Sequence, residues 1–117
     1  MPSRQETLDA YVAAWNTTDA AECRRLLERS WADTATYTDP TTHLQGRDAL
    51  VAHCTGLAIR RAGARVVITG DVDSHHQVAR FPFAVVGVDG SRLRSGIDFA
   101  EFGPEGELTR IVGFFDA

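Results

Sequence analysis

The hydrophobic pattern of this chain changes its period at Gly63. Before Gly63, apolar residues recur at spacings of three and four, as in Leu8, Tyr11, Val12 and Trp15, and these spacings are typical of one face of an α-helix. After Gly63, apolar and polar residues alternate, which is the pattern of half-buried β-strands. Helices that precede strands indicate an α+β fold, in which the helices pack on one face of a curved sheet.

The helices and strands can be assigned from capping and turn residues. Ser3-Arg4-Gln5-Glu6 and Asp19-Ala20-Ala21-Glu22 have the spacing of capping boxes, and Gly63 suits a left-handed helix cap. We expect helices at about residues 3–16, from 19 to Ser30 or Trp31, and 46–63. We expect a short strand at 35–38 and four longer strands at 65–72, 78–88, 93–102 and 108–115. The short connections between the longer strands predict an antiparallel meander.

Length and charge bound the function. A chain of 117 residues predicts one domain, residues 1–117. The net charge of −4 is spread over interspersed residues, so we expect neither a nucleic-acid partner nor a membrane partner. No apolar segment resembles a signal peptide or a membrane span, and Cys23 and Cys54 lack paired spacing. These features predict a cytoplasmic protein with free thiols.

Several catalytic classes are excluded. All 12 basic residues are arginine, so Schiff-base chemistry, a pyridoxal phosphate lysine and a Walker phosphate loop are ruled out. There is no GxSxG or HExxH motif, and adjacent His75 and His76 would point to opposite faces of a strand. We therefore expect no cofactor and no metal ion.

Three polar residues stand where apolar side chains would be expected. Tyr11 lies on the apolar stripe of the first helix, Asp39 precedes Pro40, and Asp98 alternates with the small residues Gly96 and Ala100 on one strand face. Small neighbours suggest open space in front of the Asp98 carboxyl group, as in a ligand pocket.

Each of the three also has a structural interpretation. Tyr11 can be a core residue with its hydroxyl group at the rim, and Asp39 can be a turn residue before proline. Asp98 can accept hydrogen bonds from the backbone or from an arginine such as Arg94, which lies on the same strand face.

The order of short motifs resembles a known family. Tyr11 in helix one, Ala-Thr-x-x-Asp-Pro at residues 35–40, Gly-Arg at 46–47, Ile-Thr-Gly at 68–70, Phe-Pro-Phe at 81–83 and Ile-Asp-x-x-x-Phe at 97–102 occur in sequence. Together they are similar to the ketosteroid isomerases and, more broadly, to the SnoaL-like polyketide cyclases of the nuclear-transport-factor-2-like (NTF2-like) superfamily. The resemblance implies a cystatin-like α+β cone: three N-terminal helices on a curved antiparallel sheet, with an apolar pocket and commonly a homodimer.

The resemblance also implies roles for particular residues. It places Asp39 at the position of the proton-transferring base, and Tyr11 and Asp98 at those of the two oxyanion donors. It further implies a substrate pocket lined by Phe83, Val85, Ile111, Gly113 and Phe115, with Trp31 and Cys54 at positions where bacterial isomerases have further tyrosines.

Three functions follow as hypotheses. The first is a cofactor-independent isomerase or cyclase that transfers a proton α to a carbonyl of a hydrophobic, steroid- or polyketide-like substrate through an enolate. The second is a non-catalytic module that binds a small hydrophobic molecule. The third, epoxide hydrolysis by an Asp-Arg-Asp set, is less favoured, because strand alternation puts Arg80 on the face opposite Phe81.

Overall fold

The structure is a computed structural model that describes residues 3–117, and it contains three helices and a seven-stranded sheet. The helices are α1 (Arg4–Ala14), α2 (Ala20–Ser30) and α3 (Arg47–Arg60). The strands are β1 (Trp31–Asp39), β2 (Thr42–Gln45), β3 (Arg65–Ile68), β4 (Asp73–His75), β5 (Val78–Val86), β6 (Arg92–Phe102) and β7 (Leu108–Phe115).

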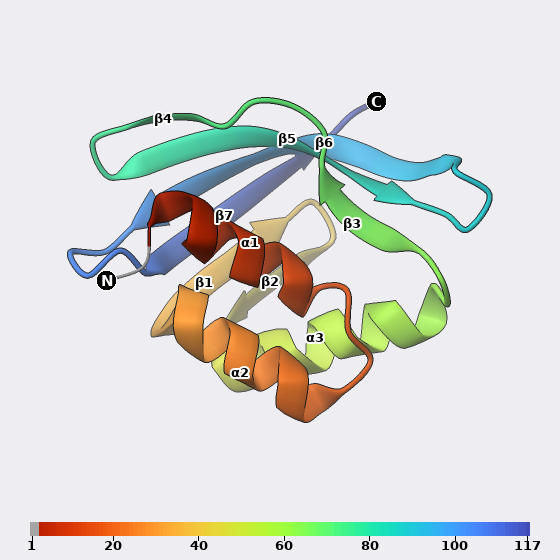
Figure 1. Ribbon diagram of the computed structural model, residues 1–117, viewed down its shortest axis with the longest axis horizontal. Helices are drawn as coiled ribbons and strands as arrows, with labels where there is room; N and C mark the ends of the chain where they lie inside the picture. The colour runs from red at the N-terminus through yellow and green to blue at the C-terminus, as the bar shows by residue number, and fades with distance from the viewer. Residues whose placement is uncertain (1–2) are drawn as a thin grey trace.

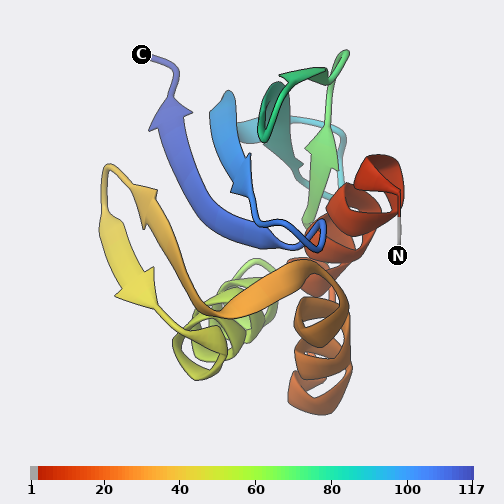
Figure 2. The same ribbon diagram turned by 90° about the vertical axis from the view of Figure 1, so that its left-hand side faces the viewer.

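The sheet curves around the helices to form an α+β cone, as the sequence predicted (Figures 1 and 2). The strand order is β2-β1-β7-β6-β5-β3, and β4 pairs with the far end of β5. Strands β5, β6 and β7 form the expected antiparallel meander. Because the sheet bends toward α1 and α3, one of its faces is concave and partly covered by helices (Figure 2).

The expectation of a wholly antiparallel sheet is wrong at one place. Strand β1 runs parallel to β7, with Tyr37 opposite Ile111 and Thr38 opposite Val112. The sequence could not show this pairing, because β1 and β7 are neighbours only after the whole chain has folded back. The two strands join the β1–β2 hairpin to the meander and so bring the end of β1 against the middle of the sheet.

Several element boundaries also differ from expectation. Strand β1 starts at Trp31 rather than at Ala35, and β2 was not predicted. The first long strand ends at Ile68 rather than at residue 72, and β4 lies in the connection between the strands expected at 65–72 and 78–88. Helix α3 ends at Arg60, before Gly63, which has the positive φ of +81° expected of a left-handed residue.

Helices α1 and α2 begin at the capping residues that the sequence indicated. The Ser3 hydroxyl accepts a hydrogen bond from the Glu6 amide at 3.1 Å, and the Ser3 amide donates to the Glu6 carboxylate at 2.8 Å, which completes the predicted capping box. Asp19 accepts from the amides of Ala21 and Glu22, but its own amide donates to Thr17 instead of Glu22. The second capping box is therefore only half formed.

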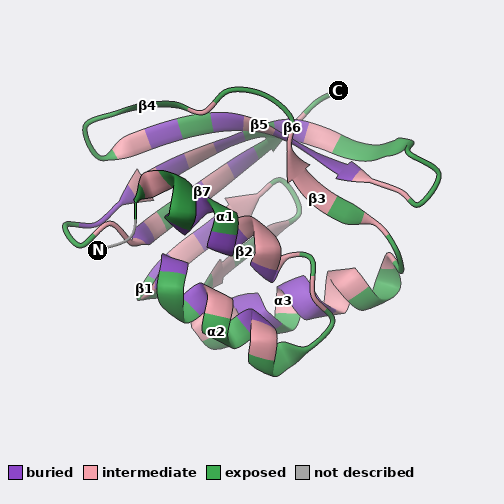
Figure 3. Cartoon of the chain, viewed as in Figure 1, coloured by how far each residue is buried: buried purple, intermediate pink, exposed green. Residues whose placement is uncertain are grey.

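The core lies between the helices and the part of the sheet formed by β1, the start of β5, the end of β6 and the start of β7 (Figure 3). The fully buried side chains Leu8, Leu27, Leu50 and Leu108 pack there with Trp31. At the other end of the cone the helices diverge from the sheet, and the space between them is not filled by side chains.

Candidate active site

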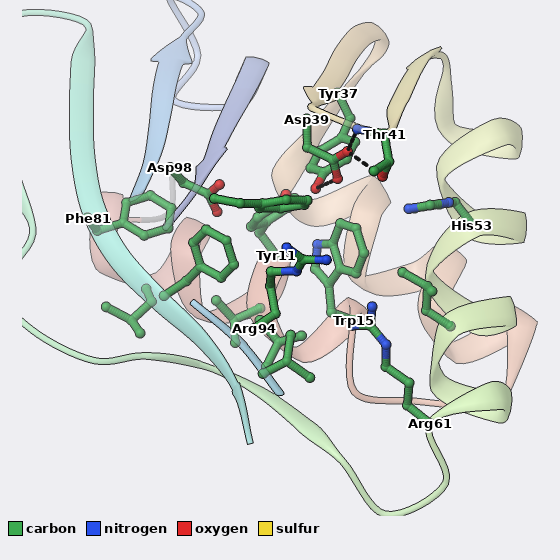
Figure 4. Close-up of a pocket in the computed structure, with 17 residues that line it drawn as sticks. Tyr11, Trp15, Tyr37, Asp39, Thr41, His53, Arg61, Phe81, Arg94 and Asp98 are labelled. Carbon is green, nitrogen blue, oxygen red and sulfur yellow. Dashed lines mark hydrogen bonds between the residues drawn. The ribbon is translucent and has the colours of Figure 1, made fainter. Parts of the chain in front are cut away.

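A cavity of about 770 Å³, its open mouth included, lies between α1, α3 and the concave face of the sheet (Figure 4). Its apolar wall is formed by Val12, Trp15, Leu57, Val66, Ile68, Phe81, Phe83, Val85 and Phe115. Its polar side chains are those of Tyr11, Tyr37, Asp39, Thr41, His53, Arg61, Arg94 and Asp98.

Asp98 enters the cavity from the middle of β6. Its strand neighbours are Phe81 on β5 and Gly113 on β7, and all three residues face inward. The residue is 9% exposed, and within residues 3–117 no hydrogen bond or ion pair is made to its carboxyl group, Arg94 included. Burial, and then the negative charge of Asp39, raise the Asp98 pKa from 3.8 to about 7. Near neutral pH, Asp98 is therefore a neutral carboxylic acid in a large fraction of the molecules, and in that form it can donate a hydrogen bond.

The space for the Asp98 carboxyl group comes from Gly113. A Cβ atom at Gly113 would lie 2.9 Å from Asp98 Oδ1 and 3.6 Å from the Cβ of Asp39. The two acidic side chains therefore flank the same glycine, one on each neighbouring strand. The sequence analysis expected open space in front of Asp98 from its small neighbours Gly96 and Ala100, and Asp98 does line the cavity. At Gly96 itself, a Cβ would collide with the Phe114 carbonyl oxygen.

Asp39 is held by three hydrogen bonds at the end of β1. The Tyr37 hydroxyl donates to Asp39 Oδ2 at 2.7 Å, and the Thr41 amide and hydroxyl donate to Oδ1 at 2.8 and 3.0 Å. The contacts to Thr41 are those of an Asp-Pro turn, so the structural interpretation of Asp39 is correct. The same side chain also lines the cavity, so the turn fixes a carboxylate in place there.

Tyr11 lies on α1 with its side chain in the cavity wall and is 2% exposed. Burial, followed by the negative charge of Asp98, raises the Tyr11 pKa well above its ordinary value. Tyr11 therefore keeps its proton at neutral pH. Figure 4 shows Tyr11, Asp39 and Asp98 directed toward the same end of the cavity.

Tyr37, Trp15 and His53 are among the cavity residues that the sequence analysis missed. Trp15 packs 5.2 Å from Tyr37 and 5.5 Å from His53, measured between ring centroids. Spacing could have found them, because Tyr37 shares a strand face with Asp39, Trp15 follows Tyr11 by four residues, and His53 precedes Leu57 by four.

Only some of the expected pocket residues line the cavity. Phe83, Val85 and Phe115 do, and Gly113 lies directly behind the two acidic side chains. Trp31, Cys54 and Ile111 do not, because all three are 0% exposed and pack in the core, where the helices lie directly on the sheet. The alternation of residues along a strand correctly predicts which side chains face inward. It does not predict whether an inward-facing side chain lies in the core or in the cavity.

Other chemical groups lie outside the cavity. Arg80 is on the opposite sheet face, where it forms an exposed ion pair with Asp73 at 3.0 Å. In the described part of the chain, no cluster of three or more His, Cys, Asp and Glu side chains is placed to hold a metal ion. None of the helices formed by residues 3–117 is long and apolar enough to cross a membrane.

Solved structures with this arrangement are numerous. A SnoaL-like family protein from Agrobacterium tumefaciens, provisionally named an isomerase, has a TM-score of 0.88 and 29% identity over 97% of each chain. A SnoaL-like protein of unknown function from Burkholderia thailandensis has a TM-score of 0.74 and 14% identity, over 97% of this chain and 95% of that one.

A protein with a ketosteroid isomerase-like fold from Catenulispora acidiphila, in complex with trimethylamine, has a TM-score of 0.75 and 17% identity. The match covers 95% of this chain and 85% of that one. No protein-family model and no curated protein sequence matches the chain. The neighbours are SnoaL-like, NTF2-like and ketosteroid isomerase-like, which confirms the superfamily that the motifs indicated.

Proposed function

We propose that this chain, whose structural neighbours are SnoaL-like and ketosteroid isomerase-like proteins, is a cofactor-independent isomerase or cyclase that works through an enolate. The observation that carries the proposal is the pair of carboxyl groups on either side of Gly113. Asp39 accepts three hydrogen bonds that fix its carboxyl group, whereas burial favours the protonated form of Asp98. Two carboxyl groups in such different surroundings can serve as a base and an acid in one cavity.

The mechanism requires no group beyond these side chains. Asp39 removes a proton from the carbon α to a substrate carbonyl, and the electron pair moves onto the carbonyl oxygen. Tyr11 and protonated Asp98 donate hydrogen bonds to that oxygen, and each bond contributes on the order of 3 kcal/mol in the transition state. Asp39 then returns the proton at another carbon, which completes an isomerisation. In a cyclisation, the enolate carbon instead attacks a second carbonyl of the same molecule, and Asp39 returns its proton to the alkoxide oxygen that forms.

Tyr37 and Thr41 act as positioning residues in this scheme. Their hydrogen bonds occupy both oxygens of Asp39 and hold the carboxylate at the cavity wall. The aromatic lining around Trp15 provides the apolar surroundings that a steroid- or polyketide-like substrate requires.

The proposal extends to partners. The ligand is a hydrophobic small molecule, and the protein is a cytoplasmic homodimer. The outer face of the sheet supports a dimer, because Ile97 and Phe114 are paired across β6 and β7 there and are 42% and 60% exposed.

A second candidate is a binding module without chemistry. The hydrogen bonds between Asp39 and Thr41 favour it, because they stabilise the turn whether or not a substrate is present. Replacing Asp39 by Asn distinguishes the two candidates, since the amide keeps the side-chain shape and removes the basic oxygen.

Turnover of a β,γ-unsaturated ketosteroid tests the isomerase directly. We expect the wild-type protein to produce the conjugated enone, followed by its ultraviolet absorbance. D39N should lower the rate by about 10²- to 10⁴-fold, the usual contribution of a general base. Asp33→Asn is the matched control, because Asp33 lies on the same strand and its side chain is 85% exposed. Equal rates for D39N and wild type would contradict the proposal.

A further inference from the structure

Two arginine side chains line the same cavity and have no role in the enolate chemistry. Arg94 comes from β6 and Arg61 from the residue that follows α3. Figure 4 shows both guanidinium groups turned toward the cavity, with Trp15 between them in this view.

Neither arginine is neutralised by the protein. Within the described residues 3–117, the ion pairs and side-chain hydrogen bonds involve other arginines, and no carboxylate lies within 4.0 Å of the guanidinium group of Arg61 or Arg94. The acidic residues of the cavity are Asp39 and Asp98, and burial favours the neutral form of Asp98. Below about pH 7, where most of Asp98 is protonated, the two arginines outnumber the carboxylates of the cavity.

The geometry of Arg94 leaves its donors available. Its guanidinium carbon lies 4.2 Å from the centroid of the Phe115 ring, so its cationic plane is supported by an aromatic face. Contact with the ring face leaves the N–H groups at the edge of the guanidinium free, and these match the two oxygens of a carboxylate.

The positive field of Arg61 reaches into the cavity. Burial lowers the pKa of His53, and the charges of Arg60 and Arg61 lower it further, against the opposing effect of Asp39. His53 is therefore neutral near pH 7, and no protonated histidine competes for Asp39 there. The excess positive charge belongs to the arginines.

We propose that the substrate is an apolar ketone that also carries a carboxylate, which Arg61 and Arg94 bind while the ketone oxygen lies at Tyr11 and Asp98. The part that concerns the ketone rests on the proposed enolate function, whereas the part that concerns the carboxylate does not. A carboxylate on the substrate would pair with two cations that have no carboxylate partner among the described residues, the half-buried Arg61 and the exposed Arg94.

Matched pairs of an acid and its methyl ester test this inference. The probes are a steroid enone with a carboxylate on its D ring, 2-naphthylacetate, and the methyl ester of each, with Kd measured by titration calorimetry. We expect each acid to bind at least about tenfold more tightly than its ester, which is the value of one charge-assisted hydrogen bond. The difference should shrink as salt is added.

Variants assign the preference to the two arginines. R61Q and R94Q should each weaken acid binding by about tenfold and leave ester binding unchanged. Arg65→Gln and Arg92→Gln are the controls, because each removes the same charge from an exposed residue that does not line the cavity. Circular dichroism of all four variants establishes that each is folded.

The outcomes separate this inference from the enolate proposal. Equal affinity for acid and ester, no binding of any probe, or R61Q and R94Q that behave like R65Q would overturn the carboxylate site. An acid preference that depends on Arg61 and Arg94, together with unchanged turnover in D39N, would support the carboxylate site while contradicting the enolate chemistry.

Discussion

Burial ties the ionisation of Asp98 to the stability of the fold. In the unfolded chain the Asp98 pKa is ordinary, whereas in the folded protein it is raised to about 7. The folded state therefore holds a proton that the unfolded state has lost between about pH 4 and pH 7, and the free energy of unfolding falls as pH rises through that interval. Above about pH 7 this contribution becomes constant.

Asp98→Asn removes this dependence. One pKa unit corresponds to about 1.4 kcal/mol, so the raised pKa costs on the order of 4 kcal/mol at high pH. We expect the stability of wild type relative to D98N, measured by urea unfolding, to decline between about pH 4 and pH 7. Asp71→Asn, an exposed substitution, should show no such trend. Parallel pH profiles for wild type and D98N would show that Asp98 ionises normally.

At the residue scale, the sequence identified the inward-facing polar groups but not their partners. Alternation along the strand correctly placed Asp98 on the concave face. It missed the hydrogen bond from Tyr37 to Asp39, although both residues lie on the same face of β1. That strand was expected to begin at Ala35 and was treated mainly as the approach to a turn, so Tyr37 was not considered.

At the element scale, the position of the two carboxyl groups depends on the parallel pairing of β1 with β7. This pairing brings the end of β1 beside Gly113, and β6 lies on the other side of the same residue. Hydrophobic alternation predicts which strands exist, and short turns predict which neighbours pair. Neither feature predicts contact between strands separated by most of the chain.

Gly113→Ala tests this arrangement. The new methyl group would lie 2.9 Å from Asp98 Oδ1, so the carboxyl group must move away from its position. We expect kcat to fall by about tenfold or more, because a small displacement of a catalytic group is costly. Gly56→Ala on α3 is the control, since its methyl group meets only the flexible end of Arg60. Unchanged kcat in folded G113A would contradict the role assigned to this contact.

At the scale of the whole molecule, the sheet has two faces with different uses. The concave face forms the core and the cavity, and the outer face exposes Ile97 and Phe114 side by side. The sequence predicted the α+β cone, because the change of period at Gly63 and the order of motifs both indicate it. The open end of the cone depends on how far the helices diverge from the sheet. The hydrophobic pattern of the sequence does not predict that distance.

The outer face provides the whole-molecule prediction. Charges at the centre of an apolar interface are strongly unfavourable, so I97E and F114E should convert the proposed dimer to a monomer in analytical ultracentrifugation. Val88→Glu is the control, because Val88 is 81% exposed but lies in the β5–β6 connection. Dimers that persist in both variants would place the interface elsewhere, and a monomeric wild type would refute the dimer.

Exchange of α-protons measures the central chemical step without requiring the natural reaction to be known. A 3-oxo steroid is incubated in D2O with wild type or D39N, and deuterium incorporation next to the carbonyl is followed by NMR. If Asp39 forms an enolate that Tyr11 and Asp98 stabilise, wild type should accelerate exchange over buffer and D39N should lose about 10²- to 10⁴-fold of that acceleration. Exchange at the buffer rate with wild type, or at the same rate with D39N as with wild type, would contradict the account.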